Sequence, residues 1–223
     1  MSIKEQVHEF IKANRQEKDI PFAARIICTN LPLNAVPTKK VEAFAKELAR
    51  TTSTIDEFPL DSHDAVCLAG FALAAMKIPA EDKVKELDKL IPSFDCWGSV
   101  DCVTCRMKNL ESEEDYFISL LKRENPFEKR VGIIWLMRFK LKSDPKKYLP
   151  IILACEDEHY YVKMAKAWSL AEAALASFDY TKETIEKLSD TFIKRKAISK
   201  CCDSFRITPE QKAKLKEIRA TIK

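Results

Sequence analysis

Residues 158–176 read EHYYVKMAKAWSLAEAALA, and this stretch decides the class of fold. It contains no glycine or proline, and its apolar residues recur at the spacing of an α-helix. Alanine, leucine, lysine and glutamate, which favour helices, are frequent here and in the whole chain. Similar segments follow one another, and none alternates apolar and polar residues as a β-strand does. The sequence therefore predicts an all-α protein.

Helical spacing and helix-start signals together predict the boundaries of thirteen helices. Prolines lie at or near several predicted helix starts, where a missing N–H removes no helical hydrogen bond. Thr208, Pro209 and Gln211 read as an N-cap, an N1 proline and a capping-box partner. The predicted helices span residues 3–15, 21–30, 37–50, 62–77, 80–91, 96–108, 113–122, 126–141, 145–154, 158–176, 181–188, 190–204 and 208–221.

Short connections between these helices predict antiparallel neighbours. Helix pairs of roughly 35–45 residues have the length of a HEAT-type unit. We therefore expect a HEAT-like repeat α-α superhelix, a curved solenoid of antiparallel helix pairs, with residues 1–223 forming a single domain. No sharp internal sequence repeat is present, so periodicity alone leaves a compact helical bundle open as an alternative.

Composition argues against several classes of protein. Only three glycines occur, too few for the turns of a β-sandwich or a nucleotide-binding α/β fold. No signal peptide and no apolar run near ~18 residues is present, so we expect no membrane span. The eight cysteines are scattered through mostly apolar, helical contexts, which suits buried thiols in the cytoplasm. No phosphate-loop, dinucleotide or zinc-protease motif occurs, so no cofactor or metal is expected.

Charge is distributed unevenly around a formal net charge of +4. Residues 1–100 carry 13 basic and 15 acidic side chains, whereas residues 101–223 carry 25 and 19. A basic C-terminal half indicates a polyanionic partner.

One candidate site lies in the segment CWGSVD, which starts at Cys96. Trp97 and Asp101 are four residues apart, so on a helix they share one face. The π face of an indole and the charge of a carboxylate together suit a planar, cationic substrate. A partly buried tryptophan beside a solvated aspartate would give the same pattern, so the residues alone leave both interpretations open.

A second group of candidates opens the predicted helix at 126–141. Lys129 and Arg130 begin it, and Arg138, eight residues after Arg130, lies on roughly the same face. Arginine there is suited to hold a phosphate with its two-pronged guanidinium group. A solvated basic face is the alternative.

Aromatic and basic residues also recur later in the chain. Tyr161 and Trp168 are seven residues apart and share one helix face, which also suits ordinary core aromatics. Lys163 lies between them in sequence. Lys194 and Arg195 begin a basic run near a helix start, where they line either a phosphate-contacting edge or a solvated helix end.

The order of these segments resembles the DNA alkylation repair (AlkD-like) family of HEAT-like repeat proteins. The strongest similarity runs from about Arg130 to Lys212, and LDKLIPSFDCWGSVDCVTCRMK, residues 87–108, is similar to the family's central signature. The resemblance weakens before residue 37. Asp19–Arg25 match poorly and look more like a branch of the family with a reduced N-terminal DNA-contacting helix.

The resemblance implies a DNA N-glycosylase, a hydrolase that excises cationic N3- or N7-alkylated purines from duplex DNA in a basic concave groove, and we expect a monomer. It implies that Trp97, Asp101 and Trp168 frame the damaged nucleotide, and that Arg130 contacts a phosphate. The further DNA-binding candidates are Lys129, Arg138, Lys163, Lys194 and Arg195. Ala171 departs from the pattern, because active members can carry a basic residue there. A non-catalytic DNA-binding module and a helical scaffold for protein partners therefore stay open.

Overall fold

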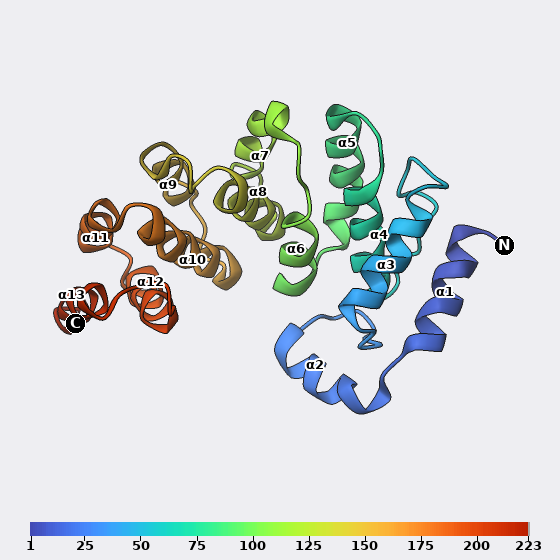
Figure 1. Ribbon diagram of the computed structural model, residues 1–223, viewed down its shortest axis with the longest axis horizontal. Coiled ribbons are helices and arrows are strands. Elements are labelled where there is room, and N and C mark those ends of the chain that lie inside the picture. The colour runs from blue at the N-terminus through green and yellow to red at the C-terminus, as the bar shows by residue number, and fades with distance from the viewer. Residues whose placement is uncertain (223) are drawn as a thin grey trace. The chain divides into compact units, whose positions relative to one another are not determined.

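The computed structural model describes residues 1–222, and over that range it contains helices and no strand (Figure 1). The prediction of an all-α helical repeat protein is confirmed. The chain divides into two compact units: unit 1, Met1–Tyr116, and unit 2, which begins at Phe117. That residues 1–223 form a single domain stays a prediction.

Unit 1 is built around a helix that is apolar on all sides. This helix, α4, reads HDAVCLAGFALAA, and nearly all of its residues are buried. Helices α1, α3, α5 and α6 pack against it. The elements of unit 1 are α1 (Ile3–Asn14), η1 (Glu17–Asp19), α2 (Ile20–Ile27), α3 (Thr38–Leu48), α4 (His63–Ala75), α5 (Ala80–Leu90), η2 (Ile91–Ser93), α6 (Trp97–Thr104) and η3 (Glu111–Glu113), and α7 (Glu114–Leu120) crosses into unit 2.

Helix α6 approaches α4 closely because Gly70 has no side chain. A Cβ at Gly70 would lie 2.7 Å from Cγ1 of Val103 and closer still to Cγ2. Val103 is fully buried on α6. The glycine on α4 therefore fixes the position of α6, the helix that carries Trp97 and Asp101.

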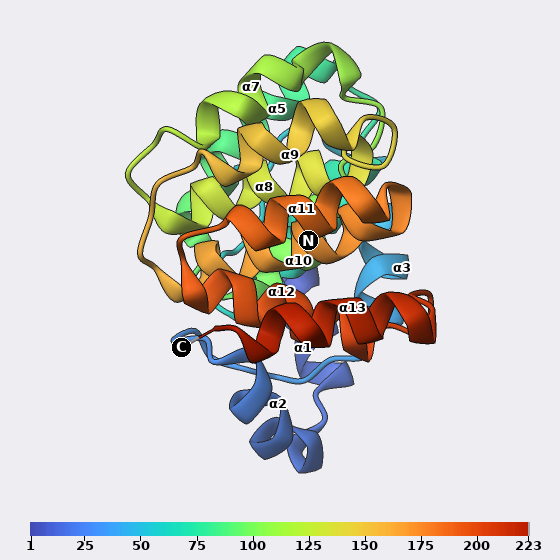
Figure 2. The same ribbon diagram turned by 90° about the vertical axis from the view of Figure 1, so that its left-hand side faces the viewer.

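Unit 2 has its helices in two rows (Figure 1). Helix α10 packs between α8 and α12 in one row, and α9, α11 and α13 form the other (Figure 2). Trp135 is fully buried in α8 and stacks on Phe117 with ring centroids 4.0 Å apart. The helices are α8 (Pro126–Phe139), α9 (Pro145–Leu153), α10 (Tyr160–Ala176), α11 (Phe178–Lys187), α12 (Thr191–Asp203) and α13 (Pro209–Ala220).

Local capping chemistry accounts for most helix boundaries. Thr208 and Gln211 form the predicted capping box at the start of α13. Three boundaries differ from prediction by three residues or more, and the first is the end of α6, which stops at Thr104 instead of residue 108. Helix α11 begins at Phe178 instead of residue 181, because Ser177 ends α10 and directly precedes α11. Helix α2 stops at Ile27, since Cys28 takes a left-handed conformation with φ of 54°.

Candidate nucleic-acid interface

Trp97 and Asp101 both lie on α6, one helical turn apart, as the sequence predicts. Trp97 is partly exposed, and its Nε1 donates a hydrogen bond of 2.9 Å to the backbone carbonyl of Ile26. This bond joins α6 to the end of α2 and fixes the orientation of the indole. Asp101 is also partly exposed, so it is not sealed behind packed helices.

A buried imidazole supports the start of α6. The Nδ1 of His63 lies 3.6 Å from Sγ of Cys96, and its Nε2 lies 3.6 Å from Sγ of Cys67. Burial lowers the pKa of His63, although the nearby carboxylates of Asp64 and Asp95 partly oppose this shift. The neutral ring bridges α4 and the residue directly before Trp97. Within residues 1–222, no cluster of three or more histidine, cysteine or acidic side chains is arranged to hold a metal ion.

Arg130 is buried, with 5% of its surface exposed. Its Nη1 donates a 2.6 Å hydrogen bond to the carbonyl of Tyr161 in the first turn of α10. The guanidinium carbon also lies 5.9 Å from the centroid of the Tyr161 ring. Arg130 therefore joins α8 to α10, and its predicted contact with a phosphate stays a prediction.

Two predicted DNA-binding lysines have acidic partners. Nζ of Lys129 lies 2.8 Å from the carboxylate of Asp157, and this hydrogen bond raises the pKa of Lys129. Nζ of Lys163 lies 2.8 Å from Asp190 and 3.0 Å from Glu158, and these bonds raise the pKa of Lys163. Both lysines stay charged, but part of their field is balanced by these neighbours.

The remaining predicted cations lie on the surface or at helix ends. Arg138 is exposed near the end of α8. Arg195 is exposed on α12, and Lys194 donates a 3.0 Å hydrogen bond from Nζ to the carbonyl of Glu186. Unit 2 carries 23 basic and 14 acidic residues, and unit 1 carries 15 and 20. The positive charge of the sequence is therefore concentrated in unit 2.

Trp168 borders a cavity of about 310 Å³ in unit 2. Its Nε1 donates to the carboxylate of Glu172 at 3.4 Å, and that carboxylate also pairs with Arg206 at 2.8 Å. Nζ of Lys200 lies 5.8 Å from the centroid of the indole. Phe205 also borders the cavity and is 94% exposed.

Sequence reasoning missed Glu172, Lys200, Phe205 and Arg206 as neighbours of Trp168. The four-residue spacing from Trp168 to Glu172 was the available signal, since side chains at that spacing meet on a helix. Lys200 and Arg206 reach the cavity from the end of α12 and the connection after it, and sequence distance gives no sign of this.

The predicted site residues fall into two groups. Trp97 and Asp101 belong to unit 1, and Arg130 and Trp168 belong to unit 2. That all four meet at one lesion stays a prediction.

Comparison with known proteins identifies one family. A family model described as DNA alkylation repair enzyme matches residues 7–202. Neither the curated proteins nor the solved structures give a match. Among the described residues, no helix has the length and apolar character needed to cross a membrane.

Proposed function

Because the chain belongs to the family of DNA alkylation repair enzymes, we propose that it is a DNA N-glycosylase that excises cationic N3- or N7-alkylated purines. The observation that carries this proposal is that Trp97 and Asp101, both partly exposed, lie one turn apart on α6. An oriented indole and an accessible carboxylate suit a substrate that is planar and positively charged.

The proposed reaction needs little acid catalysis. The bond between C1′ and the base nitrogen breaks, and its electron pair leaves with the base, which thereby becomes neutral. Asp101 stabilises the positive charge that develops on the sugar. A water molecule then adds to C1′, and its proton passes to Asp101 and on to solvent. One preorganised charged group of this kind contributes on the order of 3 kcal/mol to the transition state.

Unit 2 would hold the DNA backbone. Its excess of basic residues favours phosphates over other ligands. Exposed Arg138 and Arg195 are the predicted cations best placed for direct phosphate contact. Trp168, with Lys200 and Arg206 beside it, would line the approach to the lesion.

A non-catalytic DNA-binding protein is the second candidate function. Ala171, which lines the cavity beside Trp168, favours it, because the resemblance allows a basic residue at this position in active members. The two functions differ in their dependence on Asp101. Binding without catalysis should survive its substitution, whereas base release should not.

Release of free alkylbase from methylated duplex DNA tests the proposal. The wild-type protein should release base, and Asp101→Asn should lower the rate by roughly 100-fold, the scale of one lost electrostatic contact. Asp115→Asn is the matched control, because Asp115 is an exposed aspartate of unit 1 outside α6. If the wild-type protein releases no base where a known glycosylase does, the catalytic proposal is wrong.

The melting temperature of Asp101→Asn separates a chemical role from a structural one. It should match that of the wild-type protein, since the carboxylate is proposed to act on substrate. A large drop would assign Asp101 to the fold.

A further inference from the structure

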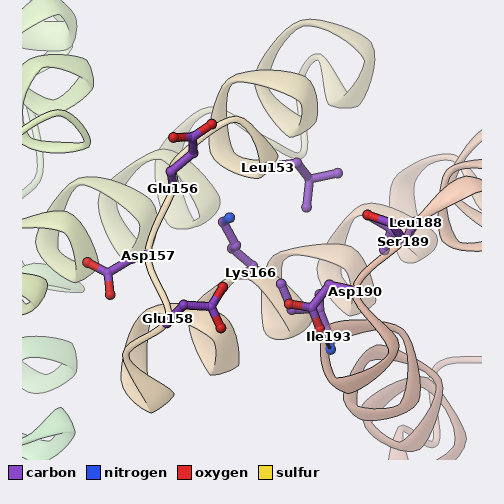
Figure 3. Close-up of a pocket in the computed structure, with 9 residues that line it drawn as sticks. All are labelled: Leu153, Glu156, Asp157, Glu158, Lys166, Leu188, Ser189, Asp190 and Ile193. Atoms are coloured by element: carbon purple, nitrogen blue, oxygen red, sulfur yellow. Dashed lines mark hydrogen bonds between the residues drawn. The ribbon is translucent and has the colours of Figure 1, made fainter.

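Unit 2 contains a cavity of about 560 Å³ that is distinct from the one beside Trp168. The α9–α10 and α11–α12 connections surround it, and Leu153, Leu188 and Ile193 form its apolar wall (Figure 3). Lys166 extends from α10 into its centre (Figure 3). Positions 166 and 168 point about 200° apart on a helix, so this cavity and Trp168 belong to different faces of α10.

The amine of Lys166 has no partner. Lys166 is 7% exposed, and no protein atom within residues 1–222 forms a hydrogen bond or ion pair with its Nζ. Thr104 Oγ1 is the one fully buried side-chain nitrogen or oxygen without a partner in residues 1–222, so the Lys166 amine itself keeps contact with the open cavity. The cavity therefore holds a donor and nucleophile that the fold itself does not use.

The carboxylates around Lys166 are mostly committed to other groups. Asp157 pairs with Lys129, and both Glu158 and Asp190 pair with Lys163. Glu156 differs, because its side chain is exposed and makes no hydrogen bond or ion pair among the described residues. Lys166 and Glu156 are thus the two unpaired charged groups of the cavity.

Burial lowers the pKa of Lys166. The thiol of Cys155 and the carboxylates of Asp190 and Asp157 oppose this shift, and the positive charge of Lys163 adds to it. A lowered pKa increases the fraction of neutral amine at neutral pH, and the neutral amine is the nucleophilic form.

We propose that Lys166 is a nucleophilic amine that forms an imine with a small, uncharged aldehyde bound in this cavity. The nitrogen lone pair attacks the carbonyl carbon, and the π electrons of the carbonyl move to oxygen. The nitrogen gives up two protons in turn, and water in the open cavity carries them to the oxygen: the first converts the oxygen to a hydroxyl group, and the second makes that hydroxyl a leaving group. The hydroxyl leaves as water, and the C=N bond forms.

The charges of the cavity select the class of aldehyde. Glu156, Asp157, Glu158 and Asp190 line the cavity, and their negative charges repel anions (Figure 3). The same repulsion disfavours the aldehyde of an abasic site in DNA, because its flanking phosphates would approach these carboxylates. A small neutral aldehyde avoids this repulsion, and its carbon chain can pack on the apolar wall.

Reductive trapping tests the proposal on the intact protein. Glycolaldehyde and cyanoborohydride at pH 7 convert each imine to a stable secondary amine, which peptide mass spectrometry assigns to a lysine. Lys12 and Lys216 are exposed and serve as internal references, one in each unit. Lys166 should be modified at least about fivefold faster than either, and this advantage should vanish in urea. Equal or slower modification of Lys166 in the folded protein would overturn the proposal.

Two further substrates test the charge selection. Glyoxylate has the same carbon skeleton as glycolaldehyde but carries a negative charge, and it should modify Lys166 more slowly relative to the references. Equal relative rates for glycolaldehyde and glyoxylate would show that the carboxylates do not select against a negatively charged aldehyde. Abasic duplex DNA with borohydride should give no covalent complex through Lys166. A complex that Lys166→Arg abolishes would identify DNA as the aldehyde source and overturn the assignment to a small molecule.

Matched variants test the role of Glu156. Glu156→Gln should narrow the difference in relative rate at Lys166 between glycolaldehyde and glyoxylate, whereas Glu217→Gln, an exposed control on α13, should not. An unchanged difference in Glu156→Gln would exclude this carboxylate from the charge selection. Because the trapping assay needs no methylated DNA, its failure leaves the glycosylase proposal standing, and absence of base release leaves the imine proposal standing.

Discussion

Arg130 contributes to the fold before it meets any DNA. Its hydrogen bond to the carbonyl of Tyr161 connects α8 with α10 inside unit 2. A charged donor is strong in a buried setting, and its loss leaves the carbonyl without this partner. A residue predicted only as a phosphate contact thus has a structural task that sequence could not reveal, since its partner is a backbone atom.

We expect Arg130→Met to lower the free energy of unfolding by about 1.5–3 kcal/mol in the absence of DNA. Chemical denaturation measures this value. Arg138→Met removes an exposed arginine from the same helix and should change stability by less than about 0.5 kcal/mol. Equal stability of both variants and the wild type would show that the hydrogen bond to Tyr161 contributes nothing.

His63 makes stability depend on pH. Its pKa in the folded protein lies below the unfolded value, because burial disfavours the charged ring. As the pH falls, the unfolded chain therefore binds a proton at a higher pH than the folded protein does. The stability that the neutral ring contributes is fully present above the unfolded pKa, and it is lost as the pH falls from there through the folded pKa.

We expect urea unfolding to show a loss of stability as the pH falls below about 6.5. His63→Gln should flatten this dependence, whereas His159→Gln, at an exposed position, should retain it. An identical pH profile for His63→Gln and the wild type would exclude His63 as its source.

At the scale of single residues, the sequence predicted which residues are candidates for the site better than it predicted which side chains those residues contact. It placed Trp97 and Asp101 on one helix face because both lie within one periodic segment. It could not predict that Lys129 and Lys163 pair with Asp157 and Asp190, since those partners lie 28 and 27 positions away. Ion pairs between distant segments depend on packing, which periodicity does not encode.

At the scale of elements, the position of α6 depends on Gly70. Gly70→Ala should destabilise unit 1 by about 1–3 kcal/mol, because the added methyl group overlaps the branched side chain of Val103. It should also reduce base release by shifting α6. Thermal unfolding and the release assay measure the two effects.

Gly98→Ala on α6 provides the control. A Cβ there would meet its nearest neighbours, His63 and Ile27, at 3.4 Å, which is ordinary contact. The substitution should be neutral or should stabilise the helix by up to about 1 kcal/mol. If Gly70→Ala behaves like Gly98→Ala, the close approach of α4 and α6 does not limit the structure.

The sequence predicted which helices exist more accurately than it predicted where each helix begins and ends. Apolar spacing located every helix, and the capping box at Thr208 fixed the start of α13. The start of α11 was misplaced because one serine separates it from α10, and no glycine or proline marks the break. Such adjacent helices are distinguished by how they pack, not by local composition.

At the scale of the whole molecule, charge predicts how DNA affinity depends on salt. Binding to phosphates releases counterions, so affinity should fall steeply as salt rises. This dependence should survive Asp101→Asn, because the carboxylate contributes no positive charge. No binding by the wild-type protein at low salt would exclude both proposed functions.

Arg138→Gln should reduce the slope of log affinity against log salt by about 1, the value of a single phosphate contact. Lys12→Gln, an exposed substitution in unit 1, should leave the slope unchanged. A fluorescence anisotropy titration of labelled duplex at several salt concentrations gives both slopes. A larger effect of Lys12→Gln would place the phosphate contacts in unit 1.

Family membership and the all-α fold could both be read from sequence, because motif order and helical period extend over most of the chain. The meeting of Trp97 and Asp101 with Arg130 and Trp168 could not be derived in the same way. It depends on how many successive helices stack, and small differences in each packing angle add along the chain.

The fluorescence of the three tryptophans can report on each unit separately. Trp97 is held by the Ile26 carbonyl at the rim of unit 1, Trp168 borders a cavity of unit 2, and Trp135 is sealed inside α8. Soluble quenchers should reach the first two indoles and spare the third. Single Trp→Phe variants would then report, by emission alone, which half of the protein a duplex touches first.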